Sequence, residues 1–282
     1  MQLCVLTLLY SSFLASLSEA SPRGGGLFVR DGGRSDSSFL AGVGVNIDAV
    51  KNVGGTTTAL PAISNVSAEW NVPFVDVKNG RNRTLYQFTG IQGNDCVDDG
   101  MRPAFLAGTA VRRSVDNDTI AWAWYQWYPG PVHSQYLEVN PGDQIHVAVS
   151  VKTPNSGYMY LKNMRTGIVF DSDMDPDDPE DTTAHICLGQ GTAGFAQKWV
   201  IQAKYDTQIV PIFQNVTFSN IMALDRGGKS YDLSAGDVDY WSLVNEGKQV
   251  EIPEQIDGKS FVIYSPEGEA WDPSAWNSTA SI

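Results

Sequence analysis

The amino-acid sequence predicts an all-β domain, either a β-sandwich or a barrel, and three observations predict it. Short runs rich in β-branched and aromatic residues recur at close intervals from about residue 39 onward. Turn signals such as "NPGD", "TPNSG" and "DRGG" separate these runs. The chain has no convincing long amphipathic helix and no internal repeat, so we expect antiparallel strands without crossover helices.

Each expected strand is identified from an apolar or alternating run bounded by turn residues. In chain order, the expected strands cover residues 39–47, 84–91, 104–111, 119–128, 143–151, 157–163, 197–205, 209–218 and 259–264.

The segment "TIAWAWYQWY" is the most aromatic of these strands, and alternation gives it two faces. One face carries Trp122, Trp124, Gln126 and Tyr128, and the other carries Ala121, Ala123, Tyr125 and Trp127. Aromatic-rich strands are ordinary core material. Gln126 keeps a second interpretation open, because a buried amide needs partners and a wet cleft supplies them. The strand therefore belongs either to a core or to a binding surface.

The 282 residues, of which 42% are hydrophobic, are enough for one large domain. Residues 1–20 read as a signal peptide that ends at small residues, so we expect a secreted or secretory-lumen protein. Residues 21–35 read as a flexible leader, 36–265 as the β-sandwich domain and 266–282 as a C-terminal tail.

In the secretory pathway, cysteines form disulfides and Asn-x-Ser/Thr sequons receive N-linked glycans. Cys4 leaves with the signal peptide, so Cys96 and Cys187 remain as one expected disulfide pair. Five Asn-x-Ser/Thr sequons are candidates for glycosylation, namely Asn65, Asn82, Asn117, Asn215 and Asn277.

The charge balance, 19 Lys+Arg against 32 Asp+Glu, argues against nucleic acid and anionic membranes as partners. The acidic stretch 171–181 is similar to a calcium loop in spacing, but Pro176 and Thr182 replace the required glycine and glutamate. We expect a solvated loop there, no metal, no cofactor and a monomeric protein. His133, His146 and His185 occur singly, and no G-x-S-x-G motif is present.

The segment "WAWYQWYP" followed by "NPGDQIHVAVS" resembles "WYEWYP … GD.I … V" of the fungal glutamic peptidases, the eqolisin or G1 family, formerly A4. Further segments resemble the family in order across residues 36–245: "FLAGVGV", "VSAEWNVP", "FTGIQG", "AFLAGT", "AQKWVIQAKY", "IVPIFQNVTF" and "GKSYDL". The resemblance implies two packed antiparallel sheets in a concanavalin A-like jelly roll, with a cleft across one face. It also implies a disulfide between Cys96 and Cys187.

The same resemblance implies that the catalytic groups are missing. Family members use a glutamate to activate water and a glutamine to stabilise the oxyanion. By position, the glutamine falls on Ala107 and the glutamate on Gln202, while two further family acids fall on Gln92 and Gln126. The pattern therefore predicts a member without peptidase activity.

The remaining cleft residues suggest a function other than proteolysis. The expected lining is aromatic and amide-rich: Phe88, Gln92, Trp122, Trp124, Gln126, Tyr128 and Gln202. Such a lining suits a small organic or peptide ligand, either held or converted in a cofactor-free cyclisation or isomerisation of a secondary metabolite. The alternatives are a secreted peptide-binding decoy or inhibitor, a residual acid endopeptidase, and a core strand in a protein that works through another surface.

Overall fold

The computed structural model describes residues 34–37, 40–46, 50–53, 56–59, 63–76, 83–94, 103–114, 118–177, 186–200, 212–234, 238–245 and 248–264. Every regular element within these ranges is a β-strand, and the strands form packed antiparallel sheets, which confirms the predicted fold class. No helix in the described ranges is long and apolar enough to cross a membrane.

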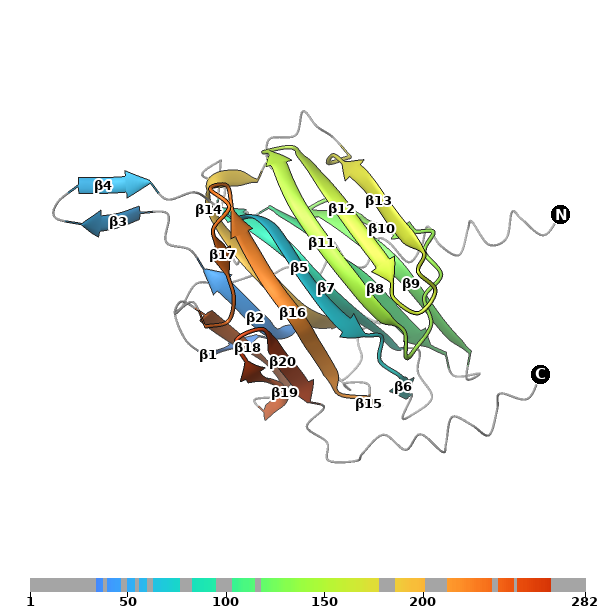
Figure 1. Cartoon of the computed structure of the whole chain (residues 1–282). Helices are drawn as coiled ribbons and strands as arrows, with labels where there is room; N and C mark the ends of the chain where they lie inside the picture. Colours follow the sequence, from blue (N-terminus) through green and yellow to red (C-terminus); the bar gives the residue numbers. More distant parts are fainter. Residues whose placement is uncertain are drawn as a thin grey trace.

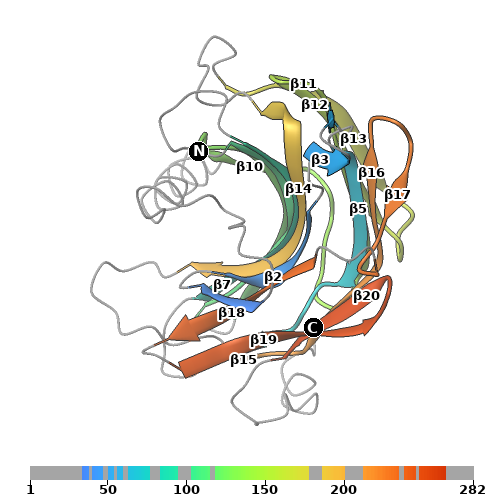
Figure 2. The same ribbon diagram turned by 90° about the vertical axis from the view of Figure 1, so that its left-hand side faces the viewer.

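Seven strands form what we call the first sheet. In spatial order they are β10 (Val132–Gln135), β9 (Thr119–Tyr128), β8 (Ala104–Arg113), β7 (Arg83–Asn94), β14 (Cys187–Val200), β2 (Leu40–Asn46) and β18 (Val238–Asn245). The sheet is curved, and Figure 2 shows its hollow side turned away from the rest of the sandwich. We call this hollow side the outer face of the first sheet.

Six strands form the second sheet, which lies in front in Figure 1. They are β20 (Ser260–Tyr264), β16 (Val216–Asp225), β5 (Ile63–Asn71), β11 (Gln144–Thr153), β12 (Ser156–Asn163) and β13 (Val169–Met174). One strand, β19 (Lys248–Asp257), pairs with β18 at its start and with β20 at its end, so it joins the two sheets along one side.

The remaining strands are short. They are β1 (Arg34–Ser37), which pairs in parallel with β18, the hairpin of β3 (Val50–Val53) and β4 (Thr56–Ala59), the pair β6 (Val75–Asp76) and β15 (Ile212–Phe213), and β17 (Ser230–Tyr231) beside β16.

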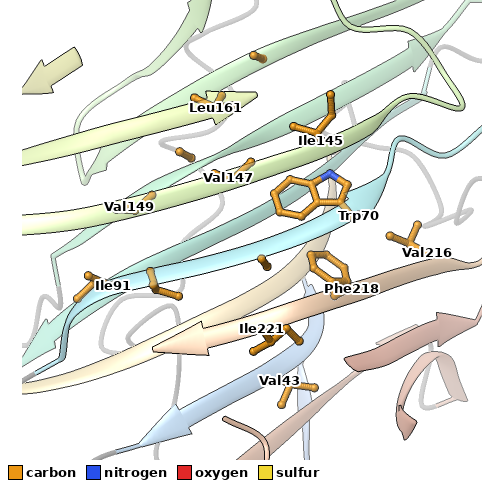
Figure 3. Close-up of a cluster of buried hydrophobic side chains, with 14 of the residues drawn as sticks. Val43, Trp70, Ile91, Ile145, Val147, Val149, Leu161, Val216, Phe218 and Ile221 are labelled. Atoms are coloured by element: carbon orange, nitrogen blue, oxygen red, sulfur yellow. The ribbon is translucent and has the colours of Figure 1, made fainter. Parts of the chain in front are cut away.

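The inner faces of the two sheets meet in a dense apolar core (Figure 3). Trp70 of β5 lies at its centre, and its ring is tilted by 43° against that of Phe218 with the ring centroids 5.2 Å apart. The indole Nε1 of Trp70 donates a hydrogen bond of 2.8 Å to Thr109 Oγ1 on β8. This bond crosses from one sheet to the other, so it satisfies a buried polar atom and fixes how the sheets face each other.

Two expectations from the sequence are wrong. The run 209–218 is not one strand, because β15 ends at Phe213 and β16 begins at Val216. The acidic stretch is not wholly a loop, since Val169–Met174 forms β13 at the edge of the second sheet. Its backbone pairs with β12, while the exposed carboxylates of Asp171 and Asp173 point outward, an arrangement that protects an edge strand from unwanted pairing.

Several sequence predictions lie outside the described residues. They concern the signal peptide, most of the leader, the C-terminal tail, and Cys96, Asn82, Asn117, His185, Gln202 and Asn277. The described strand β1 begins at Arg34, two residues inside the stretch interpreted as leader.

The predicted turn "NPGD" is present before β11 and depends on one buried carboxylate, Asp143. Asp143 Oδ2 accepts hydrogen bonds from the backbone N of Asn140 at 2.9 Å and from Asn163 Nδ2 at 2.7 Å, and Arg165 forms an ion pair with the same carboxylate. Burial raises the pKa of Asp143, but the bonds from Arg165, Asn140 and Asn163 outweigh burial, so its pKa lies below the ordinary value.

Because the folded pKa of Asp143 is depressed, its stabilisation should be complete above the unfolded pKa, near pH 4, and should be lost as pH falls through the folded value. Asp143→Asn should therefore lower stability at pH 6 and flatten the loss of stability between pH 4 and 2. Urea unfolding across this range would measure both effects, with Asp175→Asn, an exposed aspartate, as the control. Identical pH profiles for Asp143→Asn and the wild type would contradict the prediction.

Candidate functional site

The aromatic residues predicted to line a cleft come together on the outer face of the first sheet. The strand register aligns Ser134, Trp124, Gly108, Phe88, Ala196, Gly42 and Trp241 in one row across seven strands. A neighbouring row contains Gln126, Leu106, Gly90, Gly194, Gly44 and Asp239. Alternate positions of the same strands point into the core between the sheets.

These outer-face side chains form a second apolar cluster, separate from the core between the sheets. Its members are Tyr86, Phe88, Ala104, Leu106, Ala110, Trp124, Val132 and Trp241, with Trp122 and Tyr128 packed against them. Trp124 lies at the centre of the cluster. Its ring centroid is 5.4 Å from that of Tyr86 and 5.7 Å from that of Phe88, and both ring pairs meet edge to face. The strand "TIAWAWYQWY" thus contributes to a core on each of its faces.

Small residues on β8 make this packing possible. Gly108 lies between Trp124 and Phe88 in the register, and a Cβ at Gly108 would come within 1.9 Å of the carbonyl oxygen of Gln87. The neighbouring strand therefore approaches too closely for any side chain at this position. Trp124 crosses toward β8 and donates from Nε1 to the Thr109 carbonyl oxygen at 3.0 Å.

Burial divides the predicted lining residues into two groups. The exposed fractions of Phe88, Gln92, Trp124 and Gln126 are only 1%, 3%, 3% and 6%. Trp122 and Tyr128 are partly exposed. Among the predicted lining residues that the structure describes, these two aromatic side chains offer the most surface to a ligand.

Gln126, the residue that kept the binding interpretation open, finds a partner within its own turn. Its Nε2 donates a hydrogen bond of 2.7 Å to the carbonyl oxygen of Gly130, just after a cis peptide bond between Tyr128 and Pro129. A buried amide is thereby satisfied without a ligand.

Of the two positions of the family's catalytic dyad, the structure describes only Ala107. Ala107 faces the core between the sheets, fully buried and in register with Thr89 and Tyr125. Its neighbours on the outer face are Leu106 and Gly108, which carry neither an amide nor a carboxyl group. The second position, Gln202, lies outside the described residues, two positions beyond the end of β14 at Val200.

Charged groups occur at opposite ends of the outer face. Arg112 lies in register with Thr84 and Ile120 on the side of Trp122. Burial raises the pKa of Tyr86, and the charge of Arg112 opposes this shift, so the Tyr86 hydroxyl stays protonated.

Sequence reasoning missed the acidic residue at the other end of this face, Asp239 on β18, which is 2% exposed and lies opposite Gly44. The sequence signal for this neighbour was the pair of alternating glycines in "AGVGV", because glycine inside a strand often marks the close approach of another backbone.

The described histidines lie in separate places. His133 Nε2 lies 3.0 Å from Asp177 Oδ1, and the His133 ring stacks on Tyr125 with the ring centroids 4.8 Å apart. His146 contacts Glu69 at 3.2 Å on the outer face of the second sheet. Within the described ranges, no three His, Cys, Asp or Glu residues are grouped in a way that could hold a metal ion.

The disulfide and the glycosylation sites remain predictions. The register places Cys187, the first residue of β14, opposite Asn94, two positions before Cys96. Of the sequons, Asn65 lies in β5 and Asn215 is exposed between β15 and β16.

Comparison with known proteins relates the whole arrangement to one family. The sequence profile described as the Peptidase A4 family matches residues 51–265. A crystal structure of scytalido-glutamic peptidase with a transition state analog inhibitor superposes with a TM-score of 0.59 at 19% identity, over 82% of this chain and 100% of that one. No curated protein matches in sequence.

Two further structures give the same result. SCP-B, an eqolisin peptidase solved with the tripeptide Ala-Ile-His, has a TM-score of 0.57 and 18% identity over 82% of this chain and 100% of its own. Aspergilloglutamic peptidase from Aspergillus niger has a TM-score of 0.50 and 22% identity over 64% of this chain and 98% of its own. At these identities the structural likeness shows a shared fold.

Proposed function

The chain belongs to the peptidase A4 family, and from this premise we propose that it is a secreted glycoprotein that has kept the peptidase scaffold without the hydrolytic activity. In this proposal, the outer face of the first sheet binds a small organic or peptide ligand. The proposal includes a cofactor-free, non-hydrolytic step on that ligand, such as cyclisation or isomerisation of a secondary metabolite, since orientation and shape alone can promote such a step.

The observation that carries the proposal is the chemistry of the outer face around β8. Hydrolysis by the family mechanism needs an amide donor for the oxyanion and a carboxyl group to activate water. The outer face at this strand offers Leu106, Gly108 and Ala110 instead. The buried aromatic side chains leave a firm apolar floor, and an apolar floor with few polar groups is typical of sites for small organic ligands.

Trp122 and Tyr128 supply the exposed part of that floor. They lie six residues apart on the same face of β9, which corresponds to roughly 20 Å along an extended strand. A ligand that contacted both rings would span the length of the face, as a short peptide or a polycyclic metabolite does. A smaller ligand would depend on one ring alone.

A thermal-shift screen tests the ligand proposal with peptides, oligosaccharides and fractions of a fungal culture extract. A compound that raises the melting temperature of the wild type should bind at least about tenfold more weakly to Trp122→Ala, because exposed aromatic anchors commonly contribute this much. Tyr136→Ala removes a fully exposed tyrosine from the loop after β10 and is the control. An unchanged response in both Trp122→Ala and Tyr128→Ala would contradict the proposal.

A second candidate function is a peptide-binding interaction protein, such as a decoy or inhibitor. The similar structure SCP-B was solved with the tripeptide Ala-Ile-His, which favours peptides as one ligand class. If short peptides alone shift the melting temperature and leave the protein unchanged, this second candidate is supported over the metabolite enzyme.

A further inference from the structure

The sequon Asn65-Val66-Ser67 lies in the middle of the second sheet, with its asparagine on the outer face. Val66 is fully buried and pairs with Val149 in the core between the sheets. Alternation therefore places Asn65 and Ser67 on the opposite side, which lies in front in Figure 1. Asn65 itself is partly exposed.

The register leads from Asn65 directly to two tyrosines. Asn65 pairs with Ser150 on β11, and Ser150 pairs with Tyr158 on β12. In the next row, Ala148 lies between Ser67 and Tyr160. Directly opposite side chains are about 5 Å apart, so Asn65 and Tyr158 are separated by roughly 10 Å with only a serine between them. That separation is within reach of the first sugars of an N-linked glycan.

Neighbouring side chains hold both tyrosine rings in place. The Tyr158 hydroxyl donates a hydrogen bond of 2.9 Å to Asp171 Oδ2, and Lys152 lies 5.4 Å from the centre of the Tyr158 ring. The His146 and Tyr160 rings meet edge to face with their centroids 5.8 Å apart. His146 Nδ1 in turn forms a hydrogen bond of 3.2 Å with Glu69 Oε1. Rings that are already ordered lose little conformational entropy when another group packs on them.

We propose that Asn65 carries an N-linked glycan whose first sugars lie across Ser150 and pack on the rings of Tyr158 and Tyr160. A sugar ring presents an apolar face of C–H groups and polar hydroxyls at its edge, which match the apolar body and polar tip of tyrosine. The inference rests on the secretion in the proposed function. It goes beyond that function, because the glycan covers this face and leaves the first sheet as the surface for ligands.

The experiment uses the full chain secreted from a eukaryotic host. Mass spectrometry of peptides released after enzymatic deglycosylation in heavy-oxygen water would measure how fully each sequon is occupied. A double-mutant cycle of Asn65→Gln and Tyr158→Ala would then be followed by thermal unfolding. Asn215→Gln combined with Tyr136→Ala is the matched control, since both residues are exposed and lie outside strands β5, β11 and β12.

We expect Asn65 to be occupied and Tyr158→Ala to lower the melting temperature by roughly 2–4 °C more in the glycosylated protein than in Asn65→Gln. The control pair should be additive. Sugar at Asn215 but not at Asn65 overturns this inference and leaves secretion intact. Absence of sugar from every sequon overturns both. If Asn65 is fully glycosylated but the effects of Asn65→Gln and Tyr158→Ala on the melting temperature are additive, the glycan does not pack on the tyrosines and that part of the inference is overturned.

Discussion

Purified protein should leave casein intact at every pH between 2 and 7. Losing a general acid/base costs on the order of 10²- to 10⁴-fold in rate, and losing one oxyanion donor costs on the order of 10²- to 10³-fold. Gln202 stands at the position of the family glutamate, and the outer face of β8 carries Leu106 and Gly108 near the position of the glutamine. Digestion should therefore be at least about 10⁴-fold slower than by an active family member.

The measurement is release of acid-soluble peptides from casein, with an active glutamic peptidase at equal concentration as the reference. Clear digestion by the wild type that Gln202→Ala abolishes would show that this chain is a peptidase after all. Ala107→Gln provides a structural control. Because Ala107 is fully buried between the sheets, the added amide would enter the apolar core and lower stability instead of restoring an oxyanion donor.

The strands that could be predicted from sequence are those whose own composition favours a strand. β11 alternates between apolar and polar residues, and β9 and β12 are rich in aromatic residues. All three begin within one residue of the expected positions, and β9 and β12 also end where expected, whereas β11 ends two residues later. β19 contains Pro253 and several charged residues, so its pattern did not indicate a strand. It forms because its two halves pair with β18 and β20, a partnership that a local pattern does not reveal.

For the candidate site, the sequence predicted which side chains share a face of the sheet, but not how deeply each side chain is buried. Alternation correctly placed Trp122, Trp124 and Tyr128 together and Trp127 opposite them. It did not show that Trp241, more than a hundred residues away in sequence, completes an apolar cluster on the same face. The family resemblance likewise placed the missing glutamine at Ala107, and only the pairing with Thr89 and Tyr125 shows that this position faces inward.

Trp124→Ala should lower the free energy of unfolding by about 3–5 kcal/mol, the usual cost of truncating a buried aromatic side chain. Trp124 is 3% exposed and packs against Tyr86 and Phe88, so the truncation leaves a cavity that these rings cannot refill without moving. It also removes the donor to the Thr109 carbonyl oxygen. Trp122→Ala should cost far less, because Trp122 is partly exposed and lies at the border of the cluster.

Urea unfolding of the two alanine variants and of Trp124→Phe would separate the contributions of Trp124. Trp124→Phe keeps a ring beside Tyr86 and Phe88, so it should recover part of the stability lost in Trp124→Ala, although the hydrogen bond to Thr109 is still absent. Equal stability of Trp124→Ala and Trp122→Ala would mean that the outer face is an open cleft and not a second core. If the costs differ as expected, lost ligand binding in Trp124→Ala reports a damaged fold, and Trp122 is the position at which binding can be tested.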